Sequence, residues 1–229
     1  MVLNKLDILN AFSPFVIIEE ESGVSIDRIR RLEIFEKDDG NSDPIDFNIL
    51  KDQGNIIYSL KDFKAAEDYY KMALRIMLVP FNVSMAYLTI GQEVLVEALQ
   101  TLDYNAGMIS GINEDCVDVV FDDDDDELCD CKVTSLIPLC KPVDRIIQRS
   151  VYMNMARCSL KRHRNGWATK YCSIAIAISK SLICDEENHK KQLADSLYFR
   201  GKLLISINRL KFAEKVNKTL ILLQNTLNT

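Results

Sequence analysis

The chain has 229 residues, of which 48% are hydrophobic and 27% are charged, and its formal net charge at pH 7 is −6. This is the composition of a soluble globular protein with one large domain or two small ones, and the net charge gives no general attraction to nucleic acid or anionic lipid. No segment approaches the roughly 18 apolar residues of a membrane span, and the seven irregularly spaced cysteines indicate free thiols in a reducing compartment. We therefore expect a cytoplasmic protein without a nucleic-acid or membrane partner.

The first segment, residues 1–46, is expected to be an N-terminal extension that packs on the neighbouring domain. It lacks the basic and long apolar regions of a signal peptide. Val2–Phe12 has helical periodicity, whereas Phe15–Ile18 and Leu32–Phe35 fit either short strands or helical pieces. The run Lys37–Pro44 is rich in Asp, Gly, Asn and Ser, which predicts a loop at the end of this segment.

Residues 47–78 have the pattern of a helical hairpin. Gly54 and Ala66 are small where two helix backbones would meet, and Tyr70 would fill the space between them. Apolar side chains recur at helical spacing in both halves of the segment. They are Phe47, Leu50, Ile57, Tyr58, Phe63, Ala66, Tyr70, Ala73 and Leu74.

The sequence pattern changes over residues 89–140, where glycines appear and short runs of alternating apolar and polar residues replace the helical periodicity. The predicted strands are Glu93–Ala98, Gly107–Ile112, Cys116–Asp122 and Lys132–Leu139. Four or five short strands in so few residues predict a small β-barrel inserted after the first hairpin.

Helical periodicity returns over residues 142–229 and predicts two more helical hairpins. Tyr152–Lys161 and Trp167–Ser181 form the first of these, and Leu193–Ile207 and Leu210–Leu223 form the second. The small residue at the start of each hairpin's second helix recurs as Ala66, Ala168 and Ala213. The sequence thus predicts a mainly α fold, a three-hairpin array interrupted by an all-β barrel.

The three hairpins resemble tetratricopeptide repeats, and roughly half of the chain carries the resemblance. The first repeat has the signature residues Leu50, Gly54, Ile57, Phe63, Ala66, Tyr70 and Ala73. The second keeps Ala156, Ala168, Cys172 and Ala175, and the third keeps Leu197, Gly201, Leu204, Leu210 and Ala213. Stacked repeats of this kind form a concave peptide-binding surface and have no catalytic groups of their own.

A narrower resemblance is to the repeats of cochaperones and large immunophilins, which hold the acidic C-terminal tail of a heat-shock chaperone with a clamp of lysine, asparagine and arginine. Lys51, Asn55 and Asn154 match three clamp positions. The two positions where a lysine and an arginine are implied carry Asp195 and Phe199 instead.

The peptide-binding residues that we predict are therefore Lys51, Asn55 and Asn154, with Arg157 and Lys202 as neighbours. A lysine supplies charge, and the two amides donate hydrogen bonds to a carboxylate.

The inserted strands resemble a Tudor-like barrel through Val94, Val96, Gly107, Ile109, Val117 and Val119. A methyl-lysine cage needs several aromatic rings. Tyr104 and Phe121 are the rings available, and Phe121 is expected to be structural. We therefore do not expect a working cage.

No other motif predicts catalysis, a cofactor or a metal. The acidic run Asp122–Glu127 lacks the spacing and glycine of a calcium loop and is expected to be a solvated hairpin loop. Cys129-Asp130-Cys131 lacks the Cys-x-x-Cys spacing of zinc sites. The basic run Lys161–Arg164 is expected to be solvated surface.

The sequence favours a noncatalytic scaffold or adaptor that binds a peptide of a partner protein, with a chaperone cofactor as one form of it. One alternative is a structural subunit or homodimer whose groove is occupied by the protein itself. A second alternative is the repeat region of an immunophilin whose prolyl-isomerase domain lies outside this chain.

Overall fold

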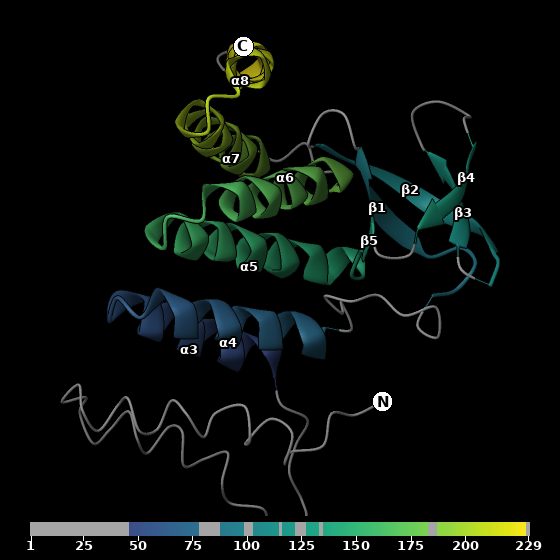
Figure 1. The fold of residues 1–229 in the computed structure, drawn as a ribbon, viewed down its shortest axis with the longest axis horizontal. Helices are drawn as coiled ribbons and strands as arrows, with labels where there is room; N and C mark the ends of the chain where they lie inside the picture. The colour runs from purple at the N-terminus through teal and green to yellow at the C-terminus, as the bar shows by residue number, and fades with distance from the viewer. Residues whose placement is uncertain are drawn as a thin grey trace, which may run out of the picture.

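A computed structural model of the chain describes residues 46–77, 88–98, 103–114, 116–121, 127–132, 135–182 and 187–227. Within these residues the structure has six helices and one five-stranded antiparallel sheet (Figure 1). Apart from Asp46, the predicted N-terminal extension lies outside the described residues, and so does the acidic run up to Asp126.

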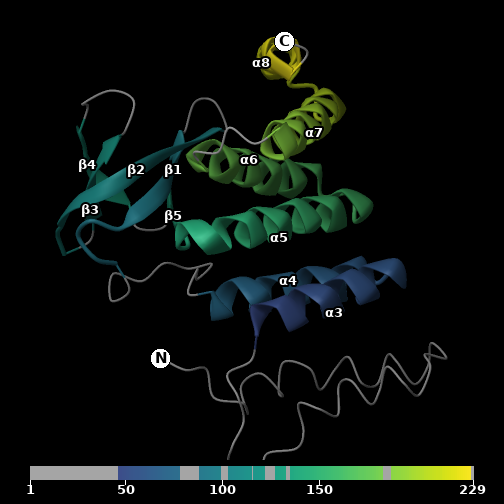
Figure 2. The same ribbon diagram turned by 180° about the vertical axis from the view of Figure 1, so that it is seen from behind.

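The helices follow one another in antiparallel pairs, α3 with α4, α5 with α6 and α7 with α8. Successive pairs are stacked, because α4 also packs on α5 and α6 packs on α7. Figure 2 shows the same stack from behind, with the sheet at one end of the helices. Their bounds are α3 Phe47–Ser59, α4 Phe63–Ile76, α5 Pro142–Lys161, α6 Asn165–Ser181, α7 Glu187–Ser206 and α8 Leu210–Leu227.

The helices predicted between residues 47 and 223 are confirmed, with shifted ends, whereas the helical periodicity of Val2–Phe12 lies outside the described residues. α5 begins at Pro142, well before the predicted start at Tyr152, and a proline fits the first position of a helix because its missing N–H needs no partner there. α7 begins at Glu187 instead of Leu193. Within the described residues, none of the helices is long and apolar enough to cross a membrane.

The sheet has the strand order β4-β3-β2-β1-β5, and all its neighbours run antiparallel. β1 pairs with β2 from Glu93↔Met108 to Ala98↔Asp103, and a register shift between Ile109 and Gly111 bends β2 against β3. The strands are β1 Glu93–Ala98, β2 Asp103–Ile112, β3 Cys116–Phe121, β4 Glu127–Lys132 and β5 Leu136–Pro138.

The predicted fold class is wrong in two respects. The strands do not close into a barrel, because β4 and β5 form opposite edges of a curled half-barrel sheet and no pairing within the described residues joins them. The molecule is a mixed α/β structure and not a mainly α tetratricopeptide-like array with a separate all-β insertion.

The physical reason for this difference is that strand β1, which lies between β2 and β5, is buried on both faces. Val94 and Val96 point into the sheet's own core, beside Ile109 and Val119. Leu95, on the opposite face, belongs to the core of the helices, together with Tyr104 and Leu139. Strand alternation therefore sends every second residue of β1 into each core, so the sheet and the helices form one structure.

Ion pairs fasten the sheet to the helices at three points. Arg145 of α5 pairs with Glu93, Lys170 of α6 lies 3.1 Å from Glu97, and Arg200 of α7 lies 2.6 Å from Asp103. The acids all come from β1 and the first residue of β2, so this part of the sheet contacts three helices. Gln148 adds hydrogen bonds to the backbone of Pro138 and Cys140, where β5 leads into α5.

The turns inside the three helical pairs share one backbone geometry. Lys61, His163 and Asn208 each have a positive φ, between 57° and 69°. In each turn the N–H of this residue donates to the carbonyl three residues earlier. The stack thus repeats its turn as well as its helices, although the turn sequences differ.

Candidate functional site

The predicted peptide-binding residues of α3 are positioned by a cap and by a glycine. Asp46 accepts a hydrogen bond from the N–H of Asn48 and starts the helix. Gly54 is buried against Tyr70, and a Cβ on Gly54 would lie 2.6 Å from the tyrosine ring. This close approach brings the Tyr70 hydroxyl to Asn55, which follows Gly54 on the exposed side of α3.

A chain of hydrogen bonds joins these residues to α5. The Tyr70 hydroxyl donates to Asn55 Oδ1 at 2.8 Å, and Asn154 Nδ2 donates to the same oxygen at 3.0 Å. Arg157 Nη1 donates to Asn154 Oδ1 at 3.0 Å. Four residues from α3, α4 and α5 therefore form one continuous polar network, which we call the amide network.

The predicted residues Asn55, Asn154 and Arg157 are thus brought together, and Lys51 lies one helical turn from Asn55 on α3. Its Nζ is 3.9 Å from Asp52 Oδ1, and 23% of its side chain is exposed. Arg157 is exposed at the other end of the network. A guanidinium has five N–H donors, so its bond to Asn154 leaves donors for a ligand. The arrangement suits an acceptor such as a carboxylate.

Lys202 does not join this group. It lies on α7 with its Nζ 4.4 Å from the centroid of the Tyr198 ring, a cation–π contact. Asp195 is exposed on the same helix, and Phe199 is half-buried against the helical core. Neither residue supplies the cation that the resemblance implies at its position.

Burial keeps the Tyr70 hydroxyl and the thiols of three buried cysteines protonated at neutral pH. Burial raises the pKa of Tyr70, and the neighbouring Cys158 and Tyr58 raise it further. Burial also raises the pKa of Cys158 to about 12, and the pKa values of Cys140 and Cys172 rise to about 12 for the same main reason. These thiols are weak nucleophiles at neutral pH, because the thiolate is the reactive form.

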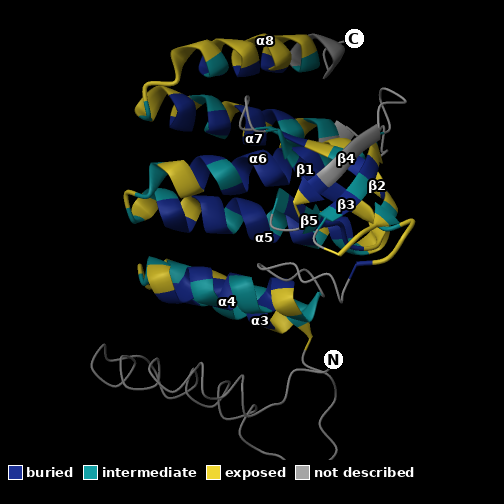
Figure 3. Ribbon diagram, turned by 45° about the vertical axis from the view of Figure 1, so that its right-hand side comes forward, coloured by how far each residue is buried: buried dark blue, intermediate teal, exposed yellow. Residues whose placement is uncertain are grey.

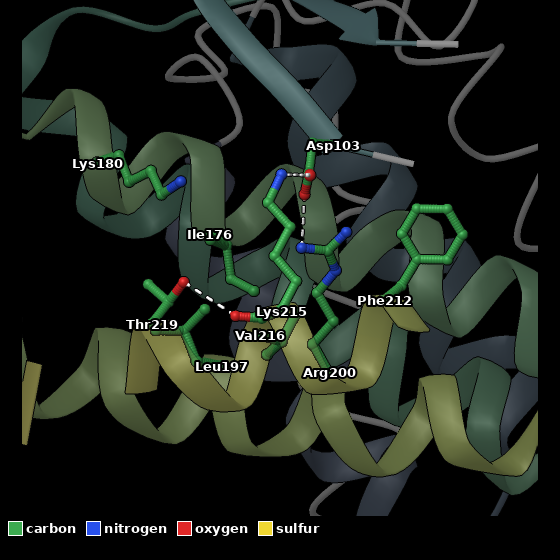
Figure 4. A pocket seen from close by; sticks show the side chains of 9 residues that line it. All are labelled: Asp103, Ile176, Lys180, Leu197, Arg200, Phe212, Lys215, Val216 and Thr219. Atoms are coloured by element: carbon green, nitrogen blue, oxygen red, sulfur yellow. Dashed lines mark hydrogen bonds and ion pairs between the residues drawn. The ribbon is translucent and has the colours of Figure 1, made fainter. Parts of the chain in front are cut away.

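The structure also contains a small basic hollow that the sequence did not reveal. Its volume is about 80 Å³, and it lies between α6, α7 and α8 beside the start of β2 (Figure 4). Arg200 reaches across it to Asp103 at 2.6 Å, and Lys215 Nζ lies 3.9 Å from the same carboxylate. No local pattern could have announced this contact, since Asp103 and Arg200 are far apart in the sequence. Because Arg200 is buried and turned toward β2, it is not available to the amide network.

A metal centre has no support in the part of the chain that the structure describes. No group of three His, Cys, Asp or Glu side chains lies together there. The buried cysteines Cys140, Cys158 and Cys172 are free thiols.

No family model, curated protein or solved structure matches this chain. The resemblance to tetratricopeptide repeats therefore stays a prediction, and so do the roles of Lys51, Asn55, Asn154, Arg157 and Lys202.

Proposed function

We propose that this chain is a noncatalytic adaptor or scaffold that binds an acidic peptide segment of a partner protein across α3 and α5. The observation that carries the proposal is the amide network, in which Asn55 and Asn154 join two helices between Lys51 and Arg157. The network fixes the amides in place, and the two cations supply the attraction for an anionic ligand.

The ligand lies along the exposed side of both helices and places a carboxylate between the two cations. Arg157 donates to it in addition to Asn154, and the Lys51 ammonium contributes as a point charge. The Tyr70 hydroxyl donates to Asn55 and so holds its amide in one orientation. The acidic C-terminal tail of a heat-shock chaperone is the ligand that the resemblance implies, and its free carboxylate meets these requirements.

A binding titration tests the proposal. The probe is a fluorescent peptide with several acidic residues and a free C-terminal carboxylate, compared with the same peptide ending in an amide. Lys51→Ala and Arg157→Ala should each weaken binding of the free-carboxylate peptide about tenfold or more, which is the loss of one charge-assisted hydrogen bond.

The matched control is Lys218→Ala on α8, whose side chain is 72% exposed and pairs with Glu214. This substitution removes the same charge from the same residue type on a remote helix, so it should leave the affinity unchanged. Equal affinities for Lys51→Ala, Arg157→Ala and the unmodified chain would show that the amide network is not the binding site.

A further inference from the structure

Three turns lie side by side at the end of the helical stack that faces away from the sheet (Figures 1 and 3). They connect α3 to α4, α5 to α6 and α7 to α8, and we call residues 60–64, 161–167 and 207–211 together the basic edge. Arg162 of the second turn lies 2.6 Å from Glu67 of α4. Asn165 Nδ2 donates to Ser206 Oγ at 3.2 Å, which ties the second turn to the third. The edge is therefore continuous.

The basic edge has the opposite charge to the chain as a whole. Within it Asp62 is the sole acid, and that carboxylate caps α4 by accepting from the N–H of Ala65. The formal charge of the whole chain is −6, so positive charge is concentrated on this edge. The cations are Lys61, Lys64, Lys161, Arg162, Arg164, Arg209 and Lys211.

Each of the three turns also exposes a large apolar side chain beside its cations. Leu60 is 42% exposed, Trp167 is 46% exposed and Leu210 is 59% exposed. Single exposed apolar residues are ordinary on a protein surface. Here one recurs in every turn of a single edge, which is a pattern typical of an interaction surface.

The second turn is held in position by a buried carboxylate. Glu67 is fully buried, with Arg162 at 2.6 Å, Lys71 at 2.9 Å and Arg164 at 3.7 Å. Arg164 also lies over the Trp167 ring, 5.4 Å from its centroid. Lys71 also lies 3.6 Å from Asp68, so two carboxylates face three cations and this part of the structure keeps one excess positive charge.

We propose that the basic edge docks on the surface of a bilayer containing anionic lipids. The cations meet the phosphate and carboxylate groups of the lipids, while Leu60, Trp167 and Leu210 enter the boundary between head groups and acyl chains. Acids elsewhere on the chain do not prevent this contact, because salt screens charges beyond about 8 Å at physiological ionic strength. The site shares no residue with the amide network, so this inference stands or falls independently of the proposed function.

The apolar side chains decide between a bilayer and the other polyanions. A nucleic-acid backbone would neutralise the cations but would leave Leu60 and Leu210 in water. An extended acidic peptide would pair with the cations of the basic edge, but it would not cover the apolar side chains of all three projecting turns together. A bilayer surface can contact all three turns at once. Its head groups pair with the cations, and its acyl-chain boundary accommodates the apolar side chains.

Trp167 is the only tryptophan in the chain, so its fluorescence reports directly on the edge. The full chain should sediment with vesicles in which about one-third of the phosphatidylcholine is replaced by phosphatidylserine. Its emission should shift to the blue on binding, because the ring leaves water. Pure phosphatidylcholine vesicles should give neither sedimentation nor a shift.

Two double variants with the same change of charge test the location. Lys61→Gln with Lys211→Gln removes a cation from the first and third turns without touching Glu67. Because each cation near an anionic surface contributes about fivefold to partitioning, binding should fall about twenty-five-fold. Lys191→Gln with Lys218→Gln changes two exposed lysines outside the edge and should bind like the unmodified chain.

Three results would overturn the inference. The first is equal vesicle binding by the two double variants, and the second is vesicle binding without a blue shift of Trp167. The third is retention on single-stranded polyuridylic acid together with no binding to vesicles, which would identify nucleic acid as the partner. Far-ultraviolet circular dichroism of each variant separates a loss of binding from a loss of fold.

Discussion

Gly54 of α3 lies directly against the buried ring of Tyr70 of α4, so closely that a Cβ at position 54 would sit 2.6 Å from Cε1 of that ring. The same ring carries the hydroxyl that donates to Asn55 at 2.8 Å. One small residue thus permits the packing of the first helical pair and the alignment of the amide network.

Gly54→Ala should therefore destabilise the protein, although alanine is the better helix former. Overpacking typically costs about 1–3 kcal/mol, and the better helix propensity of alanine returns at most about 1 kcal/mol. The ring of Tyr70 is 1% exposed and has little room to move. Urea denaturation followed by circular dichroism measures the change in the free energy of unfolding.

Gly201→Ala in α7 is the matched control for this variant. A Cβ there would meet Val216 Cγ1 at 4.0 Å, an ordinary van der Waals distance. This substitution should stabilise the protein by about 0.5–1 kcal/mol. If both alanine variants changed stability in the same direction, the contact with Tyr70 would not be the cause.

Glu67 should be more important for stability than its surface neighbours, because it is fully buried among Lys71, Arg162 and Arg164. Glu67→Gln removes the charge that those cations share. Removing one partner of a buried ion pair costs about 3–5 kcal/mol, but the cations here are 26% to 37% exposed and regain some hydration, so we expect about 2 kcal/mol.

Asp68→Asn makes the same change of charge at the next position and serves as the comparison. Asp68 lies 3.6 Å from Lys71, and 37% of its side chain is exposed. Exposed pairs contribute about 0–1 kcal/mol, so this variant should stay close to the unmodified chain in urea denaturation. If Glu67→Gln and Asp68→Asn lowered the free energy of unfolding equally, the burial of Glu67 would not increase its contribution to stability.

Arg200 and Asp103 should prove energetically coupled, since their contact joins α7 to the first residue of β2 (Figure 4). Arg200→Met and Asp103→Ala should each destabilise the protein. The double variant should cost less than the sum of the two, with an interaction energy of about 1–3 kcal/mol. Lys215→Met, whose side chain is 68% exposed and 3.9 Å from Asp103, should show coupling below about 0.5 kcal/mol. If the double variant lost as much unfolding free energy as the two single variants together, the Arg200–Asp103 pair would not couple the sheet to the helices.

Local patterns were sufficient to predict the helical pairs. The spacing of Gly54, Ala66 and Tyr70 predicted the contact between α3 and α4, and the structure confirms it. β1 was predicted with the bounds that it has, Glu93–Ala98, because its alternating valines mark a strand. Such features depend on residues close together in sequence, where periodicity carries the information.

Features that depend on tertiary contacts were missed. The sheet was predicted to be closed and separate, but Leu95 and Tyr104 join it to the helices. The pairing of Arg200 with Asp103 of the sheet was not predicted either. Likewise, the charges of Lys161–Arg164 were visible in the sequence, but only the stacking of the helices places them in line with the other two turns.

The buried thiols predict how stability depends on pH. The pKa values of Cys140, Cys158 and Cys172 are raised by burial to about 12, whereas an unfolded thiol has a pKa of about 8.5. Below about pH 8.5 the thiols are protonated in both states and have no effect. As the pH rises above that value, the unfolded chain releases protons that the folded chain retains, so the free energy of unfolding should fall.

Urea denaturation at about pH 7 and about pH 9.5 measures this loss, which should be about 1 kcal/mol per thiol at the higher pH. Cys172→Ala should reduce the difference between the two pH values by about that amount, because the side chain at position 172 no longer titrates. Ser173→Ala replaces a neighbouring buried side chain that does not titrate, so it should leave the difference unchanged whatever its effect on absolute stability. A pH difference that is the same in Cys172→Ala and in the unmodified chain would show that this thiol does not contribute.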